Sequence, residues 1–330
     1  MLKNSKKTSK SINIDRIDQN LDILQILDKY SNLYIENKIS SNLSKNTVYQ
    51  TKTILERFYE FVADEYAEND ILTISDINKY FLSNYLNKLT KSKLSKSSQK
   101  LHLTVIKNFL FFLADSDIKT YGHLKTNING IKIKTEQKEK ESFTQNEQSL
   151  LLNYLSKLDQ TNKFLAQRNS LLVKILMYTG IRISELINLK WSDISEYNDK
   201  NHSLIYTILI KGKGNKERYT YISYDIIAKN VEFLLEKSPG NEYVFMTTHG
   251  NLCNRSILYK EVGHLLSKAG ISKTGLHIFR HTFARTLVDK DVNLSTIKDL
   301  LGHSNITITA QFYAKTNENA KRNALAKLKS

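Results

Sequence analysis

Apolar side chains recur at helical spacing through the first third of the chain. In residues 22–37 they fall three or four positions apart, at Ile23, Leu27, Tyr30 and Tyr34. This period places them on one face of a helix. The same period continues in residues 44–66, 75–89 and 95–115. We therefore expect four helices, the third capped by Ser75 or Asp76 and the fourth by Ser95.

The pattern breaks in residues 127–142, which hold many charges and few large apolar side chains. This composition indicates a linker between two domains. A new apolar period starts at residue 143, where Thr144 and Glu147 fit a capping box ahead of a helix. A further helix over residues 167–180 ends at Gly180, which suits a left-handed C-cap.

Residues 202–223 carry the strongest strand signal. Two runs of β-branched and aromatic residues flank the turn sequence KGKGNKE, a pattern typical of a β-hairpin. Helical patterns then return in four segments, 255–270, 277–290, 294–303 and 307–315, with a short amphipathic tail at 317–330. The sequence predicts a mainly α protein with an N-terminal helical domain and a mostly helical C-terminal domain that holds a small antiparallel sheet.

The charge of the chain favours a polyanionic partner. Lys and Arg number 49 against 33 Asp and Glu, a net charge of +16, and nucleic acid is the first candidate for such an excess. Residues 77–114 contain no acidic side chain. Their lysines are expected to lie near a phosphate backbone, with six candidate DNA-binding residues: Lys88, Lys91, Lys93, Lys96, Lys100 and Lys107. A flexible basic arm is expected at residues 1–20.

Other classes of protein find little support. The single cysteine, Cys253, excludes an internal disulfide and fits a reducing cytoplasm. No apolar run is long enough to span a bilayer. The sequence has no Walker-type loop, no cysteine-based zinc site and no paired carboxylates. We therefore expect no metal, no cofactor and no membrane insertion.

The candidate chemistry gathers near the C-terminus. His277, Arg280, His303 and Tyr313 lie within 37 residues of one another, and Arg182 lies upstream in the segment GIRISEL. The three-residue spacing places His277 and Arg280 on one helix face. Guanidinium groups match phosphate oxygens with a planar fork of donors. Taken singly, each residue has an ordinary structural interpretation, such as a pair between Arg182 and Glu185; together they favour a site that handles a phosphodiester.

Five motifs then carry a resemblance. The segments TGIRISEL, KGKGNKER, HIFRHTFA, LLGHSNIT and QFYAK, in this order, are similar to those of the tyrosine recombinase family, especially its Xer-type resolvases. The resemblance covers residues 144–316, and the N-terminal helices resemble the family's SAM-like core-binding domain more weakly. It implies a C-shaped, two-domain clamp. The implied boundaries are 21–126 for the core-binding domain, 127–142 for the linker, 143–316 for the catalytic domain and 317–330 for a tail that contacts another protomer.

The resemblance also implies roles for seven residues. Tyr313 matches the nucleophile that forms a 3′-phosphotyrosyl link, and Lys213 matches the lysine that protonates the 5′-hydroxyl leaving group. Arg182 and Arg280 match the pair that clamps the scissile phosphate, and Glu185 matches an acidic residue that supports the first arginine. His277 matches the acid–base histidine, and His303 matches the histidine that donates to a non-bridging oxygen. The spacing from His303 to Tyr313 is about one residue longer than in most relatives.

The implied activity is site-specific recombination of double-stranded DNA, without metal or ATP, by a homotetramer on two sites that passes through a Holliday junction. Resolution of chromosome dimers at a dif-like site in the bacterial cytoplasm is expected, with a septal DNA translocase as a further partner. The alternatives are a phage or mobile-element integrase, a type IB topoisomerase and a non-catalytic DNA-binding protein.

Overall fold

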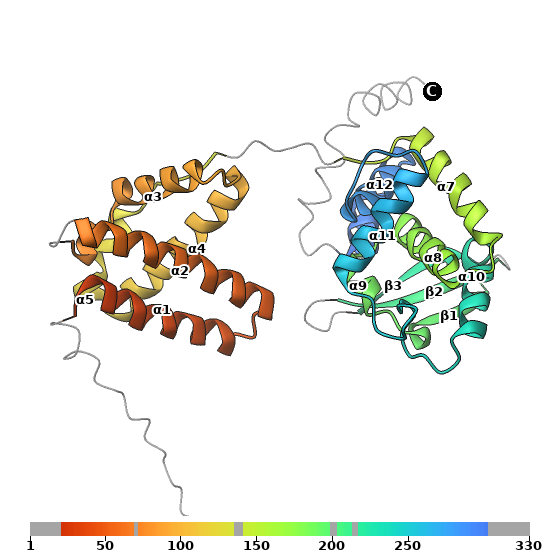
Figure 1. The fold of residues 1–330 in the computed structure, drawn as a ribbon, viewed down its shortest axis with the longest axis horizontal. Coiled ribbons are helices and arrows are strands. Elements are labelled where there is room, and N and C mark those ends of the chain that lie inside the picture. The colour runs from red at the N-terminus through yellow and green to blue at the C-terminus, as the bar shows by residue number, and fades with distance from the viewer. Residues whose placement is uncertain (1–20, 69–71, 135–140, 199–202, 213–216, 303–330) are drawn as a thin grey trace, which may run out of the picture. The chain divides into compact units, whose positions relative to one another are not determined.

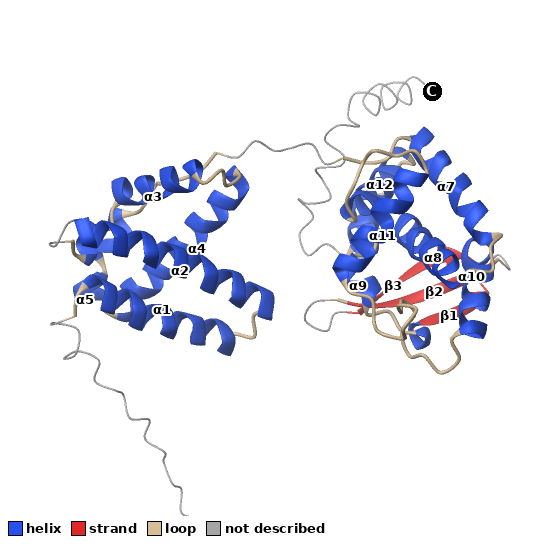
Figure 2. Ribbon diagram, viewed as in Figure 1, coloured by secondary structure: helices blue, strands red, loops and turns tan. Residues whose placement is uncertain are grey.

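The computed structural model describes residues 21–68, 72–134, 141–198, 203–212 and 217–302. They belong to two compact units, one within residues 1–137 and the other within 138–330. Figure 1 labels the elements of both units, and Figure 2 shows that helices predominate in each. No helix among the described residues is long and apolar enough to cross a membrane.

Helices are the regular elements of the described residues of the N-terminal unit. Its helices are α1 (Ile23–Ser40), α2 (Lys45–Glu68), α3 (Lys79–Lys91), α4 (Lys96–Ser116) and the short α5 (Ile118–Tyr121) and α6 (His123–Asn127). The four helices that the apolar period predicted are confirmed as α1 to α4. The two short helices continue the chain after α4 and were not expected.

One of the predicted helix starts is wrong. Helix α3 begins at Lys79, and the Asn78 side chain caps it by accepting hydrogen bonds from the backbone N–H of Tyr80 at 2.8 Å and of Phe81 at 3.1 Å. Asp76 instead accepts from the Thr73 backbone N–H at 2.7 Å and so caps a separate short 3-10 turn, Ile74–Asp76. The Ser95 cap of α4 is confirmed, since its hydroxyl accepts from the Ser98 N–H at 3.1 Å.

Several aromatic rings pack among aliphatic side chains in the core of the N-terminal unit. Tyr85 is 1% exposed, and its ring stands edge-on to that of Phe58, with centroids 5.3 Å apart. Its hydroxyl forms a 2.8 Å hydrogen bond with Nδ1 of the buried His102. Burial and the nearby charge of Arg57 lower the pKa of His102, so this interior pair is neutral at pH 7.

The C-terminal unit packs helices against a small sheet. Its helices are α7 (Gln145–Asp159), α8 (Phe164–Thr179), α9 (Ile183–Ile187), α10 (Tyr224–Lys237), α11 (Arg255–Lys268), α12 (His277–Asp289) and α13 (Leu294–Leu301), with a 3-10 turn at Trp191–Asp193. Strands β1 (Ile194–Asn198), β2 (Leu204–Lys211) and β3 (Glu217–Ser223) are antiparallel in the order β1-β2-β3. The predicted hairpin is confirmed as β2 and β3, whose register pairs Ile208 with Thr220. Strand β1 and helices α9 and α10 were not expected.

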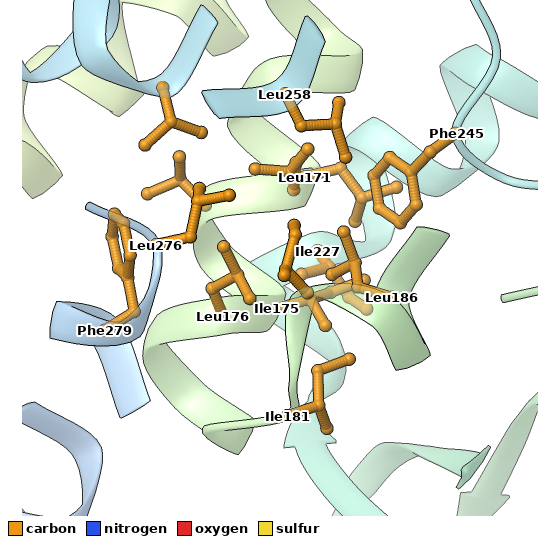
Figure 3. Packing of buried hydrophobic residues seen from close by; sticks show 14 of the residues in the cluster. Leu171, Ile175, Leu176, Ile181, Leu186, Ile227, Phe245, Leu258, Leu276 and Phe279 are labelled. Atoms are coloured by element: carbon orange, nitrogen blue, oxygen red, sulfur yellow. The ribbon is translucent and has the colours of Figure 1, made fainter. Parts of the chain in front are cut away.

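Helix α8 runs through the middle of this unit and packs against α7, α10, α12 and β3. Figure 3 shows Leu171, Ile175 and Leu176 of α8 in the apolar cluster at its centre. The helix also buries charge, because the Arg168 guanidinium pairs with Glu261, and Lys174 donates to Asp159 at 2.7 Å. Each of these two buried cations of α8 is thus matched by a carboxylate, which offsets the cost of desolvation.

Gly180 ends α8 in the left-handed region, with φ of +61°, which confirms the predicted C-cap. A Cβ at this position would lie 2.4 Å from the ring of Phe283 in α12 and 2.9 Å from Leu301 at the end of α13. Only glycine combines this backbone conformation with such close packing. The end of α8 therefore meets α12 and α13, which carry the candidate residues from the C-terminal part of the chain.

Candidate active site

Buried neighbours hold Arg182 and Glu185 in place in the folded structure. Arg182 is the N-cap of α9, and Glu185 lies in its first turn. Ile181 and Leu186, which flank them, point into the apolar cluster (Figure 3) and are 1% and 0% exposed. Since the flanking side chains are anchored in the core, the two polar side chains have little freedom to move away.

The same arrangement holds His277 and Arg280. His277 is the first residue of α12, and Arg280 follows one turn later. Their neighbours Leu276 and Phe279 both belong to the buried cluster (Figure 3). Arg280 is buried, with 6% of its surface exposed, whereas His277 is exposed. The helix therefore presents a buried cation and an accessible imidazole side by side.

The carboxylate of Glu185 joins two arginines. It accepts from the backbone N–H of Arg182 at 2.8 Å and from its Nη1 at 2.9 Å. Arg218 of β3 also forms a fork on it, with Nη1 3.1 Å from Oε1 and Nη2 2.8 Å from Oε2. Burial alone would raise the pKa of Glu185, but the hydrogen bonds from Arg218 and Arg182 outweigh burial and hold this pKa below its ordinary value.

Three guanidinium groups converge on the C-terminal end of α13. There the last backbone carbonyls have no partner within the helix and form the negative end of its dipole. Each of these carbonyls accepts a hydrogen bond from one arginine. Arg218 Nε donates to the carbonyl of Leu300 at 3.2 Å, Arg280 Nη2 to that of Leu301 at 2.6 Å and Arg182 Nη2 to that of Gly302 at 3.0 Å. Arg280 Nη1 also donates to the carbonyl of Gly180 at 2.8 Å. Helices α8, α9, α12 and α13 and strand β3 thus meet at one cluster of positive charge.

The protonation states in this cluster suit an anionic ligand. Burial and the adjacent Arg182 lower the pKa of Arg280 to about 9, with Glu185 opposing the shift, and the group stays charged at neutral pH. Desolvation and the charges of Arg255, Arg280 and Arg182 lower the pKa of His277. A neutral imidazole beside two guanidinium groups is able to accept a proton while they hold an anion.

The remaining predicted catalytic residues, Lys213, His303 and Tyr313, lie outside the described residues. Lys213 follows Gly212, which comes directly after β2, and His303 follows Gly302, whose carbonyl accepts from Arg182. The structure brings together Arg182, Glu185, His277 and Arg280. It adds Arg218, which the sequence analysis did not single out, although it is the last residue of the quoted motif KGKGNKER.

The candidate DNA-binding lysines lie in α3, α4 and the turn between them. Lys91, Lys93, Lys96 and Lys100 are exposed, and Lys107 is half-buried with its ammonium 6.0 Å from the centre of the Phe111 ring. Lys88 is also exposed but pairs with Asp64 at 2.5 Å. Spacings of four and seven residues place Lys96, Lys100 and Lys107 on one face of α4.

The chemistry of the cluster follows from its charges. Among the described side chains at its centre, three guanidinium groups surround a single carboxylate, which leaves a net positive charge. Arginine forks in a partly desolvated site stabilise negative charge that develops on phosphate oxygens. The arrangement therefore fits the binding and activation of a phosphodiester.

Comparison with known proteins agrees with this chemistry. Residues 141–320 match the family described as the phage integrase family. The chain is 31% identical to the tyrosine recombinase XerH of Campylobacter jejuni over 253 residues, which cover 74% of this chain and 68% of that protein. It is 28% identical to the tyrosine recombinase XerC of Leptospira interrogans over 291 residues, covering 86% and 88% of the two chains.

Solved structures show the same fold. XerH site-specific recombinase bound to palindromic difH substrate matches with a TM-score of 0.74 at 22% identity, over 94% of this chain and 99% of that one. A lambda integrase dimer bound to a COC′ core site matches with a TM-score of 0.63 at 17% identity, over 88% and 78%. The chain belongs to the phage integrase family. It is a tyrosine recombinase, an enzyme of the class that carries out site-specific DNA recombination.

Proposed function

We propose that this recombinase cuts and rejoins duplex DNA with Tyr313 as the nucleophile, through a 3′-phosphotyrosyl intermediate. Arg182 and Arg280 bind the scissile phosphate, and Glu185 supports Arg182. His277 accepts the proton of Tyr313 as the tyrosine oxygen attacks phosphorus, and His303 donates to a non-bridging oxygen. Lys213 protonates the 5′ oxygen as its bond to phosphorus breaks. The observation that carries the proposal is the convergence of Arg182 and Arg280 on adjacent carbonyls of α13, directly before His303.

The energetics are consistent with these roles. A tyrosine with an ordinary pKa of about 10 is a poor nucleophile at neutral pH. The two guanidinium groups make the phosphorus more electrophilic by stabilising the extra charge of the transition state. Because one phosphoester bond replaces another, the covalent intermediate conserves the energy needed to rejoin the strand.

The proposal divides the chain as its sequence suggests. Residues 143–316 act as the catalytic domain and residues 21–126 as the core-binding domain, joined by the linker 127–142. The lysines of α3 and α4 contact the phosphate backbone, which positions the enzyme without reading sequence. Lys96 supports this role, because it stands in the first turn of α4, where the helix dipole disfavours a cation unless an anion lies nearby.

At the level of the cell, we propose a Xer-type function. Four protomers on two sites exchange strands through a Holliday junction and resolve chromosome dimers at a dif-like site, with the tail after Tyr313 docking on a neighbouring protomer and a septal DNA translocase as partner. The relatives named XerH and XerC support this assignment. An integrase of a phage or mobile element is the alternative.

The test is covalent capture of DNA. A duplex site is selected from random-sequence DNA with the wild-type protein, and a panel of duplexes is made with one nick near each central phosphate. Wild type is expected to form an adduct that survives SDS, and Tyr313→Phe is expected to form none. An adduct in the Tyr313→Phe variant would exclude Tyr313 as nucleophile, and no wild-type adduct on any duplex would favour a non-catalytic protein.

A second assay separates the cellular roles. A plasmid with two copies of the selected site is expected to resolve into two circles in the presence of the wild-type protein. Relaxation of supercoils without resolution would indicate a topoisomerase. Reaction only between two unlike sites would favour an integrase.

A further inference from the structure

Arg218 is the third guanidinium of the cluster, and the proposed reaction gives it no role. It lies in β3, five residues after Lys213. All three of its guanidinium nitrogens donate to protein oxygens, two on Glu185 and one on the carbonyl of Leu300. Because its donors are directed at the protein, its contribution is expected to come through its neighbours and not through contact with DNA.

The first contribution concerns charge. If the carboxylate of Glu185 paired with Arg182 alone, the one-to-one ion pair would cancel the positive charge with which Arg182 binds the phosphate. Two guanidinium groups share the Glu185 carboxylate, whose side chain is only 7% exposed. The shared carboxylate can orient Arg182 while the group as a whole remains positive.

The second contribution concerns geometry. Gly302 has φ of +63°, and a Cβ there would lie 3.0 Å from the guanidinium carbon of Arg218. The turn that leads to His303 is therefore closely packed on Arg218. One planar side chain contacts both the carboxylate of Glu185 and the end of α13, and it belongs to β3, the strand that begins after Lys213 in the sequence.

We propose that Arg218 is a positioning residue for strand cleavage: it clamps the carboxylate that orients Arg182 and fixes the end of α13 against β3. The inference rests on the proposed function. It assigns to β3 a part in setting the geometry of the site.

The effect of removing Arg218 should depend on pH. The groups that face Glu185 are Arg182 beside α9, Arg218 from β3 and, at longer range, Arg280 from α12. Burial raises the pKa of Glu185, and hydrogen bonds from the arginines lower it. Without Arg218 the lowering effect is smaller, so the pKa of Glu185 rises. Protonated Glu185 accepts hydrogen bonds from Arg182 less strongly, and activity is lost as pH falls through this raised pKa.

The experiment measures single-turnover adduct formation on the nicked duplexes between pH 5.5 and 9. Arg218→Gln is expected to be slower than wild type by about 100-fold at pH 6, the scale of a small misplacement of a catalytic group. The deficit should shrink by about tenfold or more at pH 8.5. Affinity for the unnicked duplex should stay within about threefold, because Arg218 directs its donors at the protein.

Two further variants separate positioning from a general loss of structure. Arg218→Lys keeps the charge but not the fork, so it should restore the wild-type pH profile with a rate about tenfold below wild type. Arg285→Gln is the matched control, because Arg285 pairs with Asp289 on the surface of α12, with Nε 3.0 Å from Oδ1. The control should match wild type at every pH.

Three outcomes would overturn the inference: a wild-type rate in Arg218→Gln, a deficit that is the same at every pH, or no recovery in Arg218→Lys. If Arg218→Gln does not fold, Arg218→Lys decides alone, since a wild-type rate there would show that the fork is not needed. Failure of the proposed function is seen separately, as the absence of a wild-type adduct.

Discussion

The two compact units bury different kinds of polar side chain. Among the described residues of the N-terminal unit, the buried polar side chains are neutral at pH 7: Thr51, Gln99 and His102. Its lysines in α3 and α4 lie mostly on the surface. The C-terminal unit buries charge, with Arg168, Lys174, Asp193 and Arg280 each at most 9% exposed.

The contrast separates two ways to use positive charge. An exposed lysine keeps its hydration and its mobility, so it can follow a phosphate backbone at low cost. A buried guanidinium is costly to desolvate, and it is tolerated because carbonyls and carboxylates hold it in one place. The first arrangement suits a long polyanion, and the second suits a single phosphate.

The largest expected effect comes from removing a fixed cation. Arg280→Gln should slow adduct formation by about 1000-fold, equivalent to about 4 kcal/mol, because a charged donor at the scissile phosphate is lost. Single-turnover rates on the nicked duplexes measure it, with Arg285→Gln as control. A loss of less than tenfold would mean that the fixed charge is not the main source of catalysis.

A smaller effect should appear in the neutral core of the N-terminal unit. Because burial lowers the pKa of His102, the unfolded chain binds a proton near its ordinary value of 6.5 while the folded chain does not. The stability that this imidazole contributes is therefore complete above about pH 6.5 and is lost as the pH falls below it. His102→Gln keeps a polar partner for Tyr85 and should weaken this acid dependence.

Circular dichroism follows both units, whereas fluorescence of the single tryptophan, Trp191, reports only the C-terminal unit. His102→Gln should change the acid dependence of the circular dichroism signal and leave that of the fluorescence signal unchanged. In this variant the Trp191 fluorescence transition should keep its acid dependence. His277 of the C-terminal unit contributes to that dependence, since burial and nearby cations lower its pKa as well. A change in both signals would show that the two units do not respond separately.

The smallest effect is expected for one exposed lysine. Lys91→Gln, Lys93→Gln or Lys96→Gln should each weaken duplex binding about two- to threefold and reduce the salt dependence by about one counterion. The adduct rate at saturating protein should not change. Fluorescence anisotropy over a salt series measures the slope, with Lys157→Gln in α7 as control. An unchanged slope in all three variants would remove α3 and α4 from the DNA interface.

Local patterns predicted much of this fold. Helices α1 to α4, α7, α8 and α11 to α13 carry periods or caps that are readable within one segment, and the sequence between β2 and β3 indicates a hairpin. The period of α10 was also present, at Ile227, Val231 and Leu234, and was overlooked. Strand β1 gave little signal, because four of its five residues are exposed.

The site was less predictable where it depends on contacts between residues that are far apart in the sequence. Arg218 lies 33 residues from Glu185 and 82 from Leu300, and no spacing rule links such positions. Residue chemistry and spacing singled out Arg182, His277 and Arg280, with Glu185 as a partner of Arg182, and the resemblance supplied their roles. Neither could show that α13 carbonyls hold the arginines. Such contacts depend on the tertiary packing of α8, α12 and α13 around Gly180.

The carbonyls of α13 also bear on when the enzyme becomes competent during its synthesis. They are the acceptors for all three arginines, yet they are synthesised 82, 21 and 120 residues after Arg218, Arg280 and Arg182, respectively. A growing chain on the ribosome can complete α8, α9, the sheet and α12 and still lack the helix end that orders the guanidinium groups. The carbonyls that hold the three guanidinium groups are therefore among the last described parts of the C-terminal unit to be synthesised.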